Sequence, residues 1–134
     1  MAGYSGTPLA RKLGIKPGHR VGLIGAPADF GDELEPLPDG VRLVRRAGGR
    51  FDVVLLFCDR SRVLEGRFAK LADAIYPDGG LWIAWPKKSS GAATDLDFTA
   101  VQHHGLAQGL VDNKVCAVDE VWSGLRFVYR REDR

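Results

Sequence analysis

Charged and aromatic side chains follow the ends of several apolar runs in this chain. The runs at 21–24, 51–57 and 81–85 are each apolar enough to be a buried strand. Carboxylates, cations and flat rings placed after such strands can form a pocket for a small molecule or a nucleotide. The alternative is that these charges are solvated or paired, as polar groups at strand ends often are. The candidate ligand-binding residues are Gly25, Asp29, Asp59, Trp85, Lys87, Ser89 and Asp119.

Lys87 is the most specific of these candidates. It comes directly after Trp85 and Pro86 at the end of a buried run, so its ammonium group could hold a phosphate or a carboxylate. The alternative is a lysine whose aliphatic stem covers the tryptophan. Lys114 is a separate and weaker candidate, for a catalytic role. It precedes a strand-like run, and a parallel arrangement would place it at the opposite edge of the sheet.

The histidines and cysteines predict neither a metal site nor catalysis. His103 and His104 are adjacent, so on a helix they point about 100° apart, and no cysteine or carboxylate completes a ligand set. We expect them at a helix end, where the dipole favours them. Cys58 and Cys116 each lie within an apolar run, where a reduced thiol fills core volume. A redox pair is the alternative.

Length, composition and charge limit the classes of protein. The 134 residues fit a single domain spanning 1–134, with 45% hydrophobic and 27% charged residues. Nineteen basic residues against seventeen acidic ones leave a net charge of +2, too small an excess to predict nucleic-acid binding. No apolar run approaches the roughly 20 residues that span a bilayer, and the N-terminus lacks the apolar core of a signal peptide. We therefore expect a cytoplasmic protein without a membrane partner.

Three segments have helical signals. "TPLARKLG" predicts a short helix with Thr7 as its N-cap and Pro8 in its first turn. Residues 60–76 carry apolar side chains at helical spacing, with charged residues between them, as in an amphipathic helix lying on a sheet. A third helix is expected to start at Thr94, which with Asp97 resembles a capping box, and to reach about His104.

The remaining segments predict strands. "VRLVRR" at 41–46 alternates like an edge strand, and a C-terminal antiparallel hairpin is expected from 115 to 131 around a turn at Ser123 and Gly124. The connection "RAGGR" is too short for a crossover between parallel neighbours, which needs about a dozen residues. Six extended residues span about 20 Å, so the chain could pass beneath the sheet to a strand two places away. The fold class expected is a three-layer, Rossmann-like, mainly parallel α/β sheet closed by the hairpin.

The order of these elements resembles a known family. "RVGLIGAP", "FDVVLLF" and above all "LADAIYPDGGLWIAWPK" are similar to the corresponding segments of a shortened S-adenosylmethionine (AdoMet)-dependent methyltransferase domain. Nearly the whole chain, from "GYSGTPLARKLGIKPGHRV" to "GLVDNKVCAVDEVWSGLRFV", also resembles a small actinobacterial family known only as a domain of unknown function. The second resemblance implies no activity.

The chain departs from the methyltransferase pattern at the cofactor loop. Those enzymes place several glycines after the first strand, whereas here only Gly25 fits and Pro27 removes a backbone donor. The family also has an acidic residue at the end of the second strand that holds the ribose hydroxyls. Arg45 and Arg46 stand there, and a guanidinium cannot accept hydrogen bonds from a diol. A hypothesis is that these arginines bind a phosphate instead.

Three functions are therefore compatible with the sequence. The first is a degenerate methyltransferase-like domain that acts as a non-catalytic ligand-binding or regulatory module, with a small molecule or a nucleotide as its ligand and homodimerisation through edge strands as one option. The second is an enzyme on the same scaffold that uses AdoMet or another nucleotide. The third is a structural protein-interaction domain. The sequence leaves the cofactor unknown.

Overall fold

The computed structural model describes residues 7–134, which form one six-stranded sheet in the order β2-β1-β3-β4-β6-β5. β6 runs antiparallel to both of its neighbours, whereas the pairs β1–β2, β1–β3 and β3–β4 are parallel. The predicted fold class is thus confirmed. The strands are β1 Arg20–Ile24, β2 Arg42–Val44, β3 Phe51–Phe57, β4 Ile75–Pro86, β5 Leu110–Ala117 and β6 Trp122–Tyr129.

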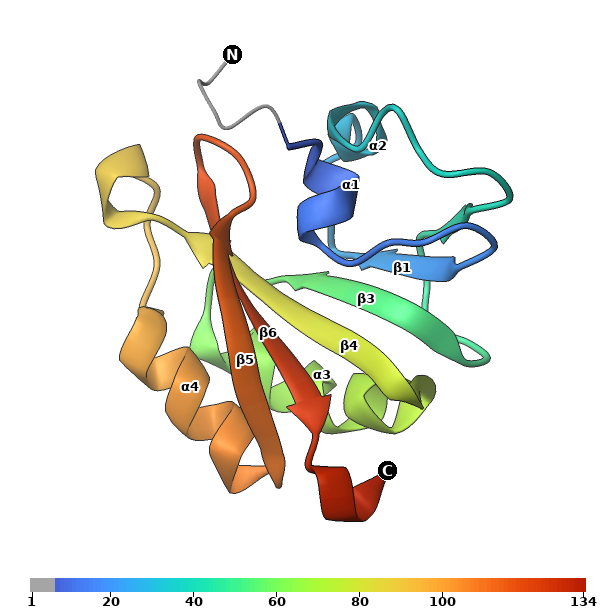
Figure 1. Ribbon diagram of the computed structural model, residues 1–134. Helices are drawn as coiled ribbons and strands as arrows, with labels where there is room; N and C mark the ends of the chain where they lie inside the picture. Colours follow the sequence, from blue (N-terminus) through green and yellow to red (C-terminus); the bar gives the residue numbers. More distant parts are fainter. Residues whose placement is uncertain (1–6) are drawn as a thin grey trace.

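Helices cover both faces of the sheet (Figure 1). The two longer helices, α3 and α4, pack on one face, and the four-residue α1 and α2 lie over the other. Each face has its own buried cluster. Phe68, Phe127 and Trp85 belong to the cluster under α3 and α4, and Leu13 and Trp82 to the cluster under α1 and α2. The helices are α1 Leu9–Lys12, α2 Phe30–Glu33, α3 Ser61–Ala74 and α4 Phe98–Ala107, with 3₁₀ turns η1 Lys88–Ser90 and η2 Arg131–Asp133.

The short connection between β2 and β3 behaves as predicted. Both strands pair in parallel with β1, one on each side, so they are two places apart in the sheet. The chain after Val44 must therefore return to the starting edge of β1 within residues 45–50. The guanidinium of Arg20 marks the end of this return, since its Nη1 donates to the carbonyl oxygen of Arg50 at 2.9 Å.

Two helix starts differ from the prediction. The N-cap of α4 is Asp97, whose carboxylate accepts from the N–H of Ala100 at 2.8 Å. Thr94 instead accepts from the N–H of Leu96 within the preceding loop, which makes a local turn rather than a cap. α1 has Pro8 at its N-cap position instead of Thr7. α4 also continues to Ala107, three residues beyond the expected end at His104.

The C-terminal hairpin forms, but its turn lies elsewhere. Ser123 and Gly124 are inside β6, where they pair with β4 on one side and with β5 on the other. The turn is instead built around Asp119, whose carboxylate accepts from the N–H groups of Val121 and Trp122, both at 2.8 Å. β5 also starts five residues earlier than expected, which places Lys114 within the strand, opposite Arg126, instead of ahead of it.

The two cysteines do not form a redox pair. Cys58 belongs to the cluster under α3 and α4, whereas Cys116 packs against the cluster on the other face. Both thiols are free, and burial raises the pKa of Cys58 to about 12, with the charge of Asp59 adding to the effect. Cys58 is therefore a core residue, as the first of the two interpretations predicted.

Candidate functional site

The strand order brings most of the candidate residues to one edge of the sheet. We call this edge, formed by the residues that follow β1, β3, β4 and β5, the carboxyl-end rim. β5 and β4 are both antiparallel to β6, so they run in the same direction and Asp119 reaches the same rim as Lys87. The N–H of Lys87 donates to the carbonyl oxygen of Val121 at 2.7 Å, which joins the two segments directly.

Gly25 ends β1 in the conformation that glycine favours. Its φ is +71°, and a Cβ at this position would lie 2.9 Å from the carbonyl oxygen of Phe57. The residue is thus required by the approach of β3 as well as by its own backbone angle. A glycine in the first-strand turn therefore has a structural explanation that needs no ligand.

Arg45 binds the turn that follows β1. Its Nη1 donates to the carbonyl oxygen of Pro27 at 3.2 Å, and its Nη2 donates to that of Ala28 at 3.1 Å. The side chain therefore links the end of β2 to the segment where a methyltransferase-like fold would receive its cofactor. Arg46, the second residue of the pair, is exposed.

An aromatic cluster lies beside this turn, on the sheet face under α1 and α2. The ring of Phe57 packs edge-to-face against Phe30 at a centroid distance of 4.8 Å and against Trp122 at 5.1 Å. Phe30 and Phe57 are only 1% and 3% exposed. These rings fill space between α2 and the ends of β3 and β6 with protein atoms.

Lys87 and Asp119 are engaged with the hairpin turn. The ammonium group of Lys87 donates to the backbone carbonyl of Asp119 at 2.6 Å, while the carboxylate of Asp119 caps its own turn. Lysine and aspartate thus hold the β5–β6 turn against the end of β4. Neither of the two interpretations of Lys87, a ligand site or a stem over tryptophan, includes this contact.

The other candidate residues take less part in the contacts that hold the carboxyl-end rim together. Trp85 is 6% exposed and packs edge-to-face with Phe98, so it belongs to the core. Ser89 is exposed, and it is Ser90 whose hydroxyl donates to the carbonyl of Lys87 at 2.6 Å. Asp29 and Asp59 are exposed, and Asp29 precedes α2 without capping it through its side chain.

Asp95 is a residue of this rim that the sequence analysis missed. Its carboxylate accepts from both the N–H and the hydroxyl of Ser61, at 2.7 and 3.0 Å, at the first residue of α3. These two hydrogen bonds lower the pKa of Asp95. A negative charge at a helix N-terminus is stabilising. The partners are 34 residues apart in the chain, so no local sequence signal pairs them.

The histidines are part of the helix. His104 packs edge-to-face against Phe68 at 5.2 Å between ring centroids, and His103 is exposed. Within residues 7–134, no three histidine, cysteine or acidic side chains gather in a way that could hold a metal ion. In the same part of the chain, no helix has the length and apolar character needed to cross a membrane.

Two cavities lie away from the candidate residues. One, of about 480 Å³, is bounded by α1 and the proline-rich segment 36–38. The other, of about 210 Å³, opens near the starts of β3 and β4 and is lined by several cations, among them Lys16, Lys114 and Arg126. None of these three was a binding candidate from the sequence, although Lys114 was considered for catalysis.

Several solved structures with a similar fold are methyltransferases. No family model and no curated protein sequence matches the chain. The magnesium protoporphyrin IX methyltransferase of Synechocystis with bound SAH is 13% identical, with a TM-score of 0.57 over 85% of this chain and 75% of that one. The precorrin-6y C5,15-methyltransferase of Geobacter metallireducens is 11% identical, with a TM-score of 0.61 over 91% and 86%. DhpI in its SAH complex is 11% identical, with a TM-score of 0.63 over 92% and 83%.

Proposed function

We propose that this chain is a methyltransferase-like domain that acts as a ligand-binding or regulatory module and does not transfer methyl groups. The pair of hydrogen bonds from Arg45 to the carbonyls of Pro27 and Ala28 carries the proposal. Arg45 occupies the position at which the resembled family has a ribose-binding acid. Its guanidinium already donates hydrogen bonds to the turn that would face the cofactor.

The residues of the carboxyl-end rim do not offer AdoMet the contacts that the resembled methyltransferase family provides. The single glycine approaches the backbone of Phe57, and the aromatic rings of Phe30, Phe57 and Trp122 pack beside it. Guanidinium groups are donors only, so Arg45 and Arg46 cannot accept hydrogen bonds from the ribose hydroxyls.

An AdoMet-dependent or other nucleotide-dependent enzyme is the second candidate function. The observation that favours it is the fold, because two solved structures with bound SAH, a methyltransferase and DhpI, match most of this chain at TM-scores of 0.57 and 0.63. Fold alone does not determine function, however, and the side chains of the rim argue for the first proposal.

Thermal unfolding with AdoMet, S-adenosylhomocysteine, NADP and ATP, each near millimolar, separates the two candidates. A ligand present at 100 times its Kd stabilises a protein by about 2.7 kcal/mol, which raises the Tm of a domain of this size by several degrees. We expect no shift with AdoMet or S-adenosylhomocysteine. A shift of several degrees with either one would overturn the non-catalytic proposal and direct the search to methyl acceptors.

Variants of Arg45 and Arg46 test whether the hydrogen bonds of Arg45 to the turn stabilise the protein. Arg45→Asp should lower the Tm, because two turn carbonyls lose their partner and a carboxylate is placed beside them. Arg46→Asp makes the same charge change at a position that is exposed like Arg45, but no hydrogen bond of Arg46 to the turn is lost, so it should alter the Tm little. If the two substitutions change the Tm equally, the hydrogen bonds of Arg45 are not what distinguishes this rim, and the proposal loses its main support. Loss of NADP or ATP binding in Arg46→Asp would instead support the hypothesis that this arginine binds a phosphate.

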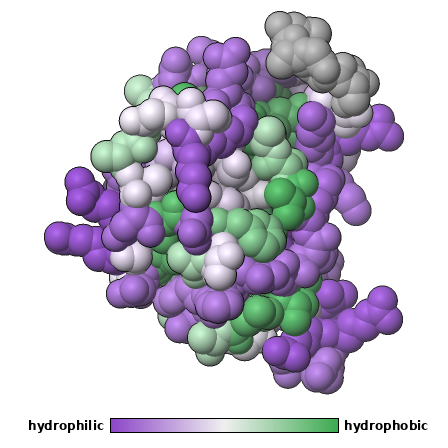
Figure 2. All heavy atoms as spheres, turned by 90° about the vertical axis from the view of Figure 1, so that its left-hand side faces the viewer, coloured by the Kyte–Doolittle hydropathy of each residue, from purple (hydrophilic) through white to green (hydrophobic). Residues whose placement is uncertain are grey.

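A protein-interaction domain is a weaker alternative. The β5 and α4 side carries Phe98, Leu106 and Val115 as exposed apolar residues, and Val115 on the edge strand is 57% exposed. Figure 2, which looks onto that side, shows apolar residues in small groups separated by polar ones. Static light scattering on the purified chain measures whether it dimerises through these residues.

A further inference from the structure

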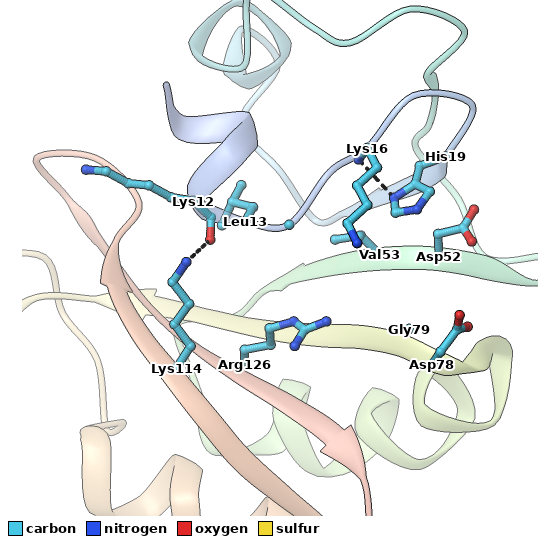
Figure 3. Close-up of a pocket in the computed structure, with 11 residues that line it drawn as sticks. Lys12, Leu13, Lys16, His19, Asp52, Val53, Asp78, Gly79, Lys114 and Arg126 are labelled. Atoms are coloured by element: carbon cyan, nitrogen blue, oxygen red, sulfur yellow. Dashed lines mark hydrogen bonds between the residues drawn. The ribbon is translucent and has the colours of Figure 1, made fainter. Parts of the chain in front are cut away.

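The 210 Å³ cavity lies at the opposite edge of the sheet from the carboxyl-end rim. Its floor is formed by the starts of β3 and β4, at Asp52, Val53 and Gly79, and its sides by β5, β6 and the segment after α1. We call it the basic cavity. Figure 3 shows Arg126 extending along β4 towards Gly79, and Lys16 reaching down from the segment after α1. Residues from five parts of the chain thus meet in one small space.

Arg126 is the central residue of the basic cavity. It is half-buried in β6, and its Nε is buried with no hydrogen-bond partner among residues 7–134. Neither Asp52 nor Asp78, which line the same cavity, forms an ion pair with it, nor does any other carboxylate of the described chain. A buried N–H of a charged group destabilises the folded protein when it has no hydrogen-bond acceptor. The placement of this guanidinium therefore lowers the free energy of unfolding.

The backbone beneath the guanidinium is shaped to fit it. A Cβ at Gly80 would lie 2.4 Å from Nε of Arg126, so only glycine lets the side chain lie flat on β4. Gly79 is equally constrained, since a Cβ there would lie 2.7 Å from the carbonyl oxygen of Asp52. Both glycines lie within β4, where Gly80 makes room for Arg126 and Gly79 makes room for the backbone of Asp52.

Two lysines add positive charge to the cavity. The ammonium group of Lys114, which is opposite Arg126 in the sheet, is fixed by donating to the carbonyl oxygen of Lys12 at 2.6 Å. Lys16 is exposed and points into the cavity from above. His19 accepts a hydrogen bond on Nδ1 from the N–H of Lys16, so its neutral ring carries the proton on Nε2 and is a further donor.

We propose that the basic cavity binds a small phosphate-bearing molecule, with the guanidinium of Arg126 and the ammonium group of Lys16 beside the phosphate. A planar guanidinium and an ammonium group are usual donors for a phosphate. Asp52 and Asp78 at the other end of the cavity are acceptors, so the rest of the ligand carries a donor such as an amine. This site is separate from the carboxyl-end rim and does not depend on whether a nucleotide binds there.

Nuclear magnetic resonance titration of the whole chain at constant ionic strength tests the proposal. The probes are O-phosphoethanolamine, which has both a phosphate and an amine, and ethyl phosphate, which lacks the amine. We expect the Nε–H signal of Arg126 and the amide of Gly79 to shift with both probes, with the amide of Lys87 at the far rim unchanged. Phosphoethanolamine should bind about tenfold more tightly, a ratio that corresponds to one charge-assisted contact. Equal affinity for the two probes would show that the two aspartates do not bind the amine.

Two variants and a control separate a binding site from general attraction to a basic surface. Arg126→Met should weaken phosphoethanolamine binding by about tenfold or more, while the free protein keeps or gains stability because a buried unpaired donor is gone. Lys16→Gln, at an exposed position, should weaken binding without affecting the fold, and Lys88→Gln at the other edge should change nothing. Affinity unchanged in both Arg126→Met and Lys16→Gln, or shifts spread over all surface lysines, would overturn the proposal, as would no binding in the millimolar range.

Discussion

At the scale of single residues, cations of this protein bind backbone carbonyls. Arg45 donates to the turn after β1, Lys87 to the β5–β6 turn, and Lys114 to the end of α1. Each of these side chains is a residue that sequence reasoning assigns to a ligand or to catalysis, because a cation at a strand end suits both roles. Arg126 differs from them, since its buried Nε has no acceptor within the described part of the chain.

The thiol of Cys58 should be inert in the folded protein. Its pKa of about 12 lies about three units above that of an ordinary thiol, so roughly a thousandfold less of it is thiolate at pH 8. We expect a disulfide reagent to modify Cys58 only after addition of guanidinium chloride. The Cys58→Ser variant identifies which thiol reacts. Rapid modification of Cys58 in the native protein would contradict its burial.

The carboxylate of Asp95 should make stability depend on pH. Its pKa is lowered in the folded protein by the hydrogen bonds from Ser61, so its stabilising effect is complete above the ordinary aspartate value of about 3.9 and is lost as the pH falls through the lower, folded value. Asp95→Asn should therefore have a lower Tm than the wild type at pH 7. The difference should narrow below about pH 4. A constant difference from pH 7 to pH 2 would rule out the charge as its cause.

At the scale of elements, close contacts between helices and strands override local propensity. Gly105 lies in the last turn of α4, and glycine inside a helix is unfavourable by about 1 kcal/mol relative to alanine. A Cβ at this residue would lie 2.0 Å from the ring of Phe127, which is fully buried and packs against Phe68. The glycine thus sets how near α4 approaches β6.

Gly105→Ala should destabilise the protein although alanine favours helices. Moving the buried Phe127 ring costs about 1–3 kcal/mol, which exceeds the gain of about 1 kcal/mol in helix propensity. Gly66→Ala in α3, where a Cβ would meet nothing within 4 Å, is the matched control and should be stabilising. Urea unfolding measures both free energies. The prediction fails if Gly105→Ala is as stable as Gly66→Ala.

At the scale of the whole molecule, one sheet joins two separate cores and presents two different edges. The carboxyl-end rim is filled by side chains of the chain itself, whereas the basic cavity at the other edge is open and has an unpaired donor. The solved methyltransferases share the arrangement of the sheet. The proposed ligand site of this chain is therefore at the edge that the resemblance does not predict.

The two cores should unfold together because β3 and β4 contribute to both of them. Trp82 reports on the face under α1, where its Nε1 donates to the carbonyl of Leu13 at 3.0 Å, and Trp85 reports on the face under α4. In a Trp122→Phe background, which removes the third tryptophan, urea unfolding followed by fluorescence in Trp82→Phe and in Trp85→Phe should coincide, within each variant, with unfolding followed by circular dichroism. Separate midpoints in one variant would show that its two faces unfold independently.

The sequence by itself determined the order and the type of most elements. Residues 51–57 are a strand and 60–76 contain a helix because the spacing of apolar side chains is a local property of the chain. The separation of β2 from β3 also followed, since five residues cannot cross over to a parallel neighbour. The sequence predicted turns less accurately. Ser123 and Gly124 are residue types that favour turns, but pairing with two neighbouring strands holds them in β6.

Only the tertiary structure decided what the charged residues contact. Asp95 meets Ser61 across 34 residues and Lys114 meets Lys12 across 102, and no periodicity in the chain links such pairs. The basic cavity likewise depends on the register that sets Lys114 opposite Arg126, and on Gly80 of β4, which leaves room for the guanidinium. A shift of one residue in that register would place the two cations on opposite faces of the sheet, because side chains alternate along a strand.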